Sequence, residues 1–193
     1  DVLGDGACAV TSDSYLFPKR EGGAAAAFCK AEGIRHYVFQ SDPLSEVDGF
    51  RDNPKDRCYI CKKSIFTDIV NTARQYGFDY VAEGSNIDDL SDFRPGMRAV
   101  RVLGVPSPLE DAGLTKADIR ALSKELGLPT WDKPSFACLA TRFVHGEGEG
   151  ARNARADRDK SERDTADYGS LRRNQRLLQI ARFYARIRGP RWL

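Results

Sequence analysis

No part of the 193-residue sequence approaches the ~18–20 consecutive apolar residues that a membrane span requires. No basic and then apolar leader opens it, and no internal repeat is visible. Charge of one sign is not in excess either, because 30 Lys and Arg residues oppose 28 Asp and Glu residues for a net charge of +2. These absences predict a protein without a membrane partner, and they give no electrostatic argument for binding nucleic acid.

The cysteine content does not suit a disulfide framework. Five cysteines, an odd number, occur in a chain whose hydrophobic fraction of 41% can build a core and excludes wholesale disorder. We therefore expect a cytoplasmic protein with functional thiols. The length corresponds to one ordinary domain or to one and a half small ones.

Strand and helix signals alternate along the first two thirds of the sequence. The predicted strands cover 7–11, 35–39 and 79–83, and the predicted helices cover 18–32, 58–76 and 115–127. This order implies right-handed crossovers and a doubly wound parallel α/β sheet. Ligands of such sheets bind beyond the carboxyl ends of the strands, which here are residues 11–14, 40–42 and 84–89.

The last quarter of the sequence differs in composition. Residues 147–167 contain no apolar side chain larger than alanine and carry dense charge, which predicts disorder. Apolar residues at helical spacing over 177–187 then predict an amphipathic, Arg-rich helix that packs on the domain or on a partner. We therefore divide the chain into an α/β domain over 1–143, a charged linker over 144–170 and a helical tail over 171–193.

Cys58 and Cys61 form a CxxC motif at the start of a predicted helix, after Arg57 and before Lys62 and Lys63. A helix N-terminus and flanking cations both lower the pKa of a thiol, so this position favours thiolate chemistry or metal ligation. The motif alone fits a redox dithiol, half a zinc site, two ligands of an iron–sulfur cluster, or two ordinary half-buried thiols. No second CxxC and no paired histidines accompany it, which argues against a closed structural zinc site.

Cys138 lies among small residues between Lys133 and Arg142. The two cations favour the thiolate and could hold an anionic substrate, although a single cysteine is more often a core residue. With Cys58 and Cys61 it makes a set of three. Three thiolates can hold a 4Fe–4S cluster and leave its fourth iron open to an exogenous ligand.

Polar residues follow the third predicted strand, over 83–89. Glycine permits a close approach of the backbone to a ligand there, Ser and Asn offer hydrogen bonds, and the paired Asp88 and Asp89 can hold magnesium or a ribose. The structural alternative is a strand-to-helix loop in which Ser85 or Asn86 caps a short helix.

Together these blocks resemble the LarE family of ATP-dependent sulfur transferases, in the PP-loop ATP pyrophosphatase superfamily. The blocks are RCYICK over 57–62, EGSNIDDLSDFRPG over 83–96, LPTWDKP over 128–134 and ACLATR over 137–142. The resemblance extends from about residue 2 to about residue 143 and implies an adenine nucleotide alpha hydrolase-like fold. The superfamily's phosphate-binding SGGxDS loop is not in this sequence, so we expect an N-terminally incomplete domain that starts just after it. After His145 the family is no longer recognised.

The resemblance implies a specific reaction. Family members use ATP and magnesium to adenylate a carboxylate of a pyridinium dicarboxylate mononucleotide, and then install sulfur to give a thiocarboxylate. The product is a precursor of the nickel-pincer nucleotide of lactate racemase. In one branch the cysteine at the position of Cys138 gives up its own sulfur, and in another a CxxC and that cysteine hold a 4Fe–4S cluster that carries hydrosulfide. Because Cys58, Cys61 and Cys138 occur together, the chain resembles the cluster branch, with an external sulfide donor.

The resemblance also implies where ligands bind. Nucleotide- or magnesium-binding side chains are expected at Thr11, Asp13, Ser14, Gly84, Ser85, Asn86, Asp88 and Asp89, and substrate anion contacts at Lys133 and Arg142. A homo-oligomer is compatible with the family. Two rivals remain, namely a catalytically incomplete fragment that only binds metal or a cluster, and a tRNA-thiolating enzyme of the same superfamily. The lack of a dense basic patch argues against the tRNA enzyme.

Overall fold

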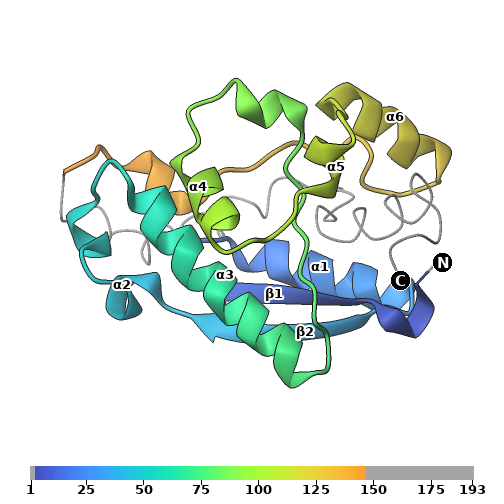
Figure 1. Cartoon of the computed structure of the whole chain (residues 1–193), viewed down its shortest axis with the longest axis horizontal. Coiled ribbons are helices and arrows are strands. Elements are labelled where there is room, and N and C mark those ends of the chain that lie inside the picture. The colour runs from blue at the N-terminus through green and yellow to red at the C-terminus, as the bar shows by residue number, and fades with distance from the viewer. Residues whose placement is uncertain (1–2, 147–193) are drawn as a thin grey trace.

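The computed structural model describes residues 3–146 (Figure 1). The predicted disorder over 147–167 and the predicted tail helix over 177–187 lie outside the described residues, as do nearly all of the predicted linker and the whole tail. Within the described part of the chain, no helix has both the length and the apolar character to cross a membrane.

Helices and strands alternate, which confirms the α/β class. In chain order the elements are β1 (Cys8–Ser14), α1 (Lys19–Ala31), β2 (Arg35–Ser41), α2 (Pro43–Glu46), α3 (Arg57–Gln75), α4 (Pro95–Val102), α5 (Pro108–Asp111) and α6 (Lys116–Glu125), with 3-10 turns at Gly4–Gly6, Phe50–Asp52, Ile87–Leu90 and Leu139–Arg142. Thr115 and Asp118 form a capping box at the start of α6, within the helix predicted over 115–127.

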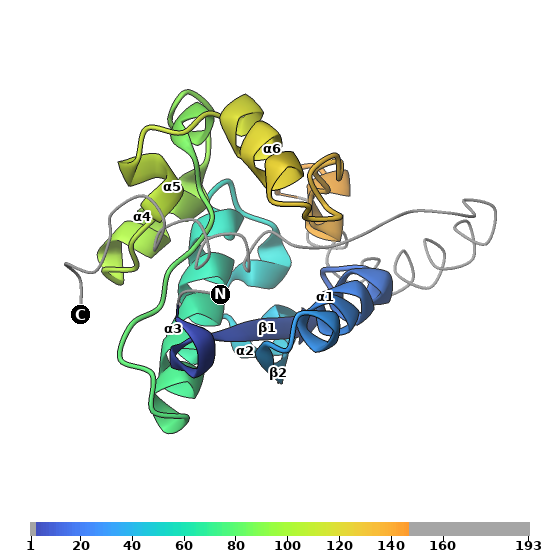
Figure 2. The ribbon, with the colours of Figure 1, turned by 90° about the vertical axis from the view of Figure 1, so that its right-hand side faces the viewer.

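The strands β1 and β2 pair in parallel, with α1 as the crossover between them. Figure 2 shows α3 on one side of β1 and α1 on the other, the arrangement expected of a doubly wound unit. The ladder continues to the pair Ser14 and Ser41, so β1 ends three residues later than predicted. Residues 12–14, which follow the predicted strand, therefore belong to the strand itself.

The prediction of a third strand over 79–83 is wrong. These residues run extended past β1 from the end of α3 toward α5 (Figure 1), but they form no ladder with another described segment. The Glu83 amide instead donates to the carbonyl of Pro106 at 3.0 Å. Val81 nevertheless packs with Val10 and Phe39 against a buried cluster. The apolar alternation that predicted the strand therefore reports side-chain burial, whereas a strand also needs a backbone partner.

Two buried apolar clusters meet along α3. One comprises Phe66, Ile69, Val100 and Val105, and it packs α3 against α4 and the strands. The other comprises Leu16, Leu44, Phe50 and Ala140, and the side chains of Cys61 and Cys138 pack against it. The second cluster thus fixes the CxxC end of α3 next to the segment that carries Cys138.

Gly96 in α4 is buried and lies close against α3. A Cβ added there would lie 3.1 Å from Lys62 Cδ and 3.3 Å from the carbonyl oxygen of Cys58. We expect Gly96→Ala to lower the free energy of unfolding by about 1–3 kcal/mol, because the backbone of α3 must shift to accept the methyl group. Urea denaturation followed by circular dichroism measures the change.

The matched control is Gly23→Ala in α1, where an added Cβ would meet nothing within 4 Å. Alanine has the higher helix propensity, so this substitution is expected to raise stability by up to about 1 kcal/mol. A Gly96→Ala protein as stable as the Gly23→Ala protein would show that the α3–α4 contact tolerates a side chain.

Candidate functional site

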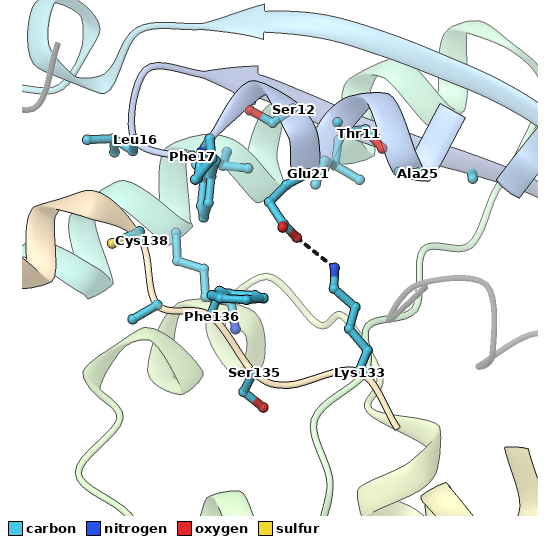
Figure 3. Close-up of a pocket in the computed structure, with 18 of the residues that line it drawn as sticks. Thr11, Ser12, Leu16, Phe17, Glu21, Ala25, Lys133, Ser135, Phe136 and Cys138 are labelled. Carbon is cyan, nitrogen blue, oxygen red and sulfur yellow. Dashed lines mark hydrogen bonds and ion pairs between the residues drawn. The ribbon is translucent and has the colours of Figure 1, made fainter. Parts of the chain in front are cut away.

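A pocket of about 580 Å³ lies between α1, α3, α6 and the segment that leads to Cys138. Figure 3 shows the residues of α1 and of the segment 133–138 facing each other across it. β1 contributes Ala9 to Asp13 to the wall, and the loop after the extended segment contributes Gly84 and Asn86. The pocket therefore brings together residues that lie far apart in the sequence.

The three predicted cysteines line one part of this pocket. Cys58 and Cys61 are half-buried on the first turns of α3, and Cys138 is half-buried just before the 3-10 turn Leu139–Arg142. The backbone amide of Leu139 donates to the carbonyl of Leu16 at 2.8 Å, which ties the Cys138 segment to the end of β1. Among residues 3–146, no three His, Cys, Asp or Glu side chains are arranged as a metal site.

The prediction that cations lower the pKa values of these thiols is not supported for Cys61 and Cys138. Burial, with smaller contributions from the neighbouring Cys138 and Cys58, raises the pKa of Cys61 to about 12. Burial also raises the pKa of Cys138, with Cys58 adding to this and Arg57 opposing it. The cost of desolvating a thiolate is thus larger than the attraction of the nearby positive charge, and these two groups are thiols in the metal-free protein.

Arg57 is the cation that opposes the rise in the pKa of Cys138, and it is only 6% exposed. Its Nη1 donates to Asn53 Oδ1 at 2.5 Å and to the carbonyl of Phe143 at 3.3 Å. Asn53 in turn donates through Nδ2 to the carbonyl of Val144 at 2.5 Å. These bonds clamp the segment after Cys138 onto the N-terminus of α3.

The two residues predicted to contact a substrate anion differ in position. Lys133 lines the pocket, and its Nζ forms a 2.7 Å ion pair with Glu21 Oε2 of α1 across the cavity (Figure 3). Arg142 is exposed and does not line the pocket. Lys133 is therefore within reach of a ligand only in competition with Glu21.

The polar loop over 83–89 acts mainly as a structural cap. Asn86 and Asp89 form a capping box on the 3-10 turn Ile87–Leu90, and Asp89 Oδ1 pairs with Arg94 Nη1 at 2.7 Å. Asp88 Oδ2 accepts the backbone N–H of Lys116 at 2.8 Å. Of the five residues proposed here, Gly84 and Asn86 line the pocket, whereas Ser85, Asp88 and Asp89 do not.

Of the three ligand-binding residues predicted on β1, two line the pocket and one does not. Thr11 and Asp13 line the pocket, and Thr11 Oγ1 lies 2.8 Å from His36 Nε2 on β2. Ser14 is buried outside the pocket, where its hydroxyl accepts the N–H of Leu16. Both pocket residues are held by neighbours on β2, since Gln40 donates to Asp13 at 3.1 Å.

Several charged residues of the pocket were not predicted from the sequence as site residues. Glu21, Lys62, Lys116 and Arg120 all line it. Lys62 follows the CxxC motif, so its place was detectable, and it pairs with the buried Glu83 at 3.6 Å. No local motif marks Glu21, because it faces the pocket only through the packing of α1.

Several known proteins are similar in sequence to this chain, and they agree on its family. The chain is 39% identical over 147 residues to an uncharacterized protein of Synechocystis sp., covering 76% of this chain and 54% of that protein. It is 34% identical over 147 residues to the pyridinium-3,5-bisthiocarboxylic acid mononucleotide synthase of Lactiplantibacillus plantarum, covering 76% of this chain and 53% of the synthase. The chain is a LarE-like member of the PP-loop superfamily.

More distant PP-loop relatives agree with this LarE-like assignment. The tRNA-specific 2-thiouridylase MnmA of Desulforamulus reducens is 30% identical over 117 residues, covering 50% of this chain and 31% of that enzyme. No protein-family model matches the chain. The fold is accordingly of the adenine nucleotide alpha hydrolase type, and the chain spans about half the length of the curated LarE-like relatives it matches.

Proposed function

We propose that this LarE-like chain is the core of an ATP-dependent sulfur transferase that converts a carboxylate of a pyridinium-3,5-dicarboxylate mononucleotide to a thiocarboxylate, in nickel-pincer nucleotide synthesis. The observation that carries the proposal is the convergence of Cys58, Cys61 and Cys138 on one pocket, in a chain similar to a pyridinium bisthiocarboxylate mononucleotide synthase. We place the protein in the cytoplasm, where thiols stay reduced.

The first half-reaction is adenylation. The substrate carboxylate attacks the α-phosphorus of ATP, pyrophosphate leaves with its Mg²⁺, and an acyl-adenylate forms. Gly84, Asn86, Thr11 and Asp13 are the proposed residues that line the pocket and could touch the nucleotide. Asp13 is the carboxylate of this set, which suits a Mg²⁺ contact. Ser14, Ser85, Asp88 and Asp89 then support the site by holding its walls.

The second half-reaction is sulfur transfer. A sulfur nucleophile attacks the acyl carbon, the carbonyl–oxygen bond to AMP breaks, and AMP leaves with the electron pair to give the thiocarboxylate. Lys133 and Arg142 are proposed to hold the substrate's anionic groups. Lys133 must exchange its partner Glu21 for that role.

The three thiols fit a 4Fe–4S cluster by donor type and number, because three cysteines leave one iron open. Cys58, Cys61 and Cys138 would hold it, and it would supply an exchangeable site for sulfide. Burial keeps Cys61 and Cys138 protonated without metal, so loading releases protons and is expected to be favoured by higher pH. The side chains as they stand form no metal site within residues 3–146, so loading also requires them to move together.

Exchange of radiolabelled pyrophosphate into ATP tests the adenylation step on this chain. We expect exchange only when ATP, Mg²⁺ and the pyridinium dicarboxylate mononucleotide are all present. Exchange dependent on tRNA instead would favour the thiouridylase reaction of the MnmA relatives. No exchange with either substrate would favour a fragment that binds metal without adenylation.

A further inference from the structure

Glu21 and Lys133 form an ion pair across the pocket. Glu21 Oε2 lies 2.7 Å from Lys133 Nζ, and the pair joins the first turn of α1 to the segment that leads to Cys138 (Figure 3). The two side chains are only 23% and 16% exposed. Arg20 also approaches Glu21, at 3.7 Å, but Arg20 does not line the pocket. The opposite charges of Glu21 and Lys133 therefore meet inside the pocket.

A partly buried ion pair selects ligands by their charge. A ligand that offers only an anion draws Lys133 away and leaves the carboxylate of Glu21 without this counter-charge. A ligand that offers only a cation leaves Lys133 in the corresponding state. Removing one partner of a shielded pair is costly, because the remaining charge is no longer compensated. A ligand that carries both charges replaces both partners at once, so the pair favours a zwitterion.

Aromatic side chains lie beside this ion pair. Phe17 and Phe136 both line the pocket and remain partly exposed, and Figure 3 shows their rings next to Glu21 and Lys133. The ring of Phe136 already attracts positive charge, since the guanidinium of Arg20 lies 5.4 Å and the ammonium of Lys133 6.0 Å from its centroid. Aromatic faces bind flat rings, and they also attract cations. The surroundings of the ion pair thus suit a flat ring with a positive charge.

The backbone of the segment that carries Lys133 is also held from α6. Arg120 Nη2 donates to the carbonyl of Lys133 at 3.4 Å, and Lys116 Nζ donates to Ser135 Oγ at 3.1 Å. These contacts do not involve Glu21. Replacing the carboxylate of Glu21 by an amide is therefore expected to change the charge of the pocket more than the course of this segment.

We propose that Glu21 is a specificity-determining residue, whose carboxylate binds the positive ring of a pyridinium substrate while Lys133 binds a carboxylate of the same ring. The inference rests on the proposed sulfur-transferase function, because that function supplies the pyridinium dicarboxylate. The two side chains neutralise each other in the structure, and in the complex each takes the opposite charge of one zwitterionic ring. No covalent bond changes in this exchange of partners.

Two small dicarboxylates isolate the charge of the ring. The probes are 1-methylpyridinium-3,5-dicarboxylate and benzene-1,3-dicarboxylate, which carry the same pair of carboxylates on a cationic and on a neutral ring. Isothermal titration calorimetry on the full chain, without ATP, gives both dissociation constants. We expect the cationic ring to bind at least about tenfold more tightly. Nonspecific attraction works against this result, because more cations than carboxylates line the pocket and the neutral ring has the larger net negative charge.

Variants assign the preference to Glu21. Glu21→Gln should abolish it, so that the two probes bind equally, whereas Lys133→Gln should weaken both. Glu32→Gln is the matched control, because Glu32 follows α1 directly but does not line the pocket, and it should keep the full preference. If Glu21→Gln fails to fold, Glu21→Asp takes its place and should reduce the preference, since its carboxylate is one CH₂ further from the ligand.

The ratio of the two dissociation constants is the decisive quantity. An ion pair with a purely structural role would weaken both probes alike when it is broken, and the ratio would stay unchanged. Equal binding of the probes by the unmodified chain, no binding of either, or an unchanged ratio in the Glu21 variant overturns the proposal.

This outcome is separable from that of the proposed function, because the probes bind without ATP. Pyrophosphate exchange without a preference for the cationic ring removes only the role of Glu21. A preference that depends on Glu21, without exchange, supports the role of Glu21 and removes the adenylation function.

Discussion

Cys138→Ala is expected to abolish thiocarboxylate formation, with a loss of at least about a thousandfold, while pyrophosphate exchange continues. The reason is chemical, because Cys138 carries sulfur in both routes that the proposed function allows. As a cluster ligand it is needed to hold the iron, and as a sacrificial donor its own sulfur enters the product. The measurement is mass spectrometry of the mononucleotide product, run in parallel with the exchange assay.

Cys58→Ala and Cys61→Ala separate the two routes. In the cluster route both substitutions should remove iron and product formation as Cys138→Ala does. In the sacrificial route both should still form one product per chain, and Cys138 should lose the elements of H₂S to become dehydroalanine. Cys29→Ala is the control, because Cys29 lines the same pocket but comes from α1. Full product formation by Cys138→Ala would contradict the assignment of this residue to sulfur transfer.

The three cysteines illustrate what the sequence predicts and what it does not. Motif spacing identified Cys58, Cys61 and Cys138, and the structure brings all three to one pocket. The pKa values of Cys61 and Cys138 were misjudged, because neighbouring cations are visible in a sequence and burial is not. Burial depends on the cluster of Leu16, Leu44, Phe50 and Ala140, whose members come from distant segments.

Backbone pairing between strands is the second feature that the sequence predicts only in part. The parallel pair β1–β2 and the helices α1, α3 and α6 follow from local periodicity and caps, and all were predicted within a few residues. The extended segment over 79–83 has the side-chain pattern of a strand but no described ladder partner. Periodicity describes which side chains are buried, whereas strand formation depends on a second segment that no local signal specifies.

Asp89→Ala is expected to lower the free energy of unfolding by about 1–3 kcal/mol in magnesium-free buffer. Asp89 Oδ2 accepts from both the backbone N–H and the side-chain amide of Asn86, at 3.1 Å each. Asn86 is buried, so the substitution leaves two donors without partners and without water. The ion pair with Arg94 adds little, because Arg94 is 43% exposed.

Asp88→Ala is the matched control, because the two carboxylates are adjacent but differ in burial. Asp88 bonds the exposed backbone N–H of Lys116, which water can satisfy after the substitution, so we expect a loss below about 1 kcal/mol. Urea denaturation in chelator, repeated with ATP and Mg²⁺, measures both variants. A magnesium ligand would give the opposite pattern, because its removal would leave the chelated protein as stable as before and would abolish stabilisation by ATP and Mg²⁺. A loss of stability in chelator would therefore identify Asp89 as a capping residue. The Mg²⁺ contact is then expected at Asp13, the proposed carboxylate that lines the pocket.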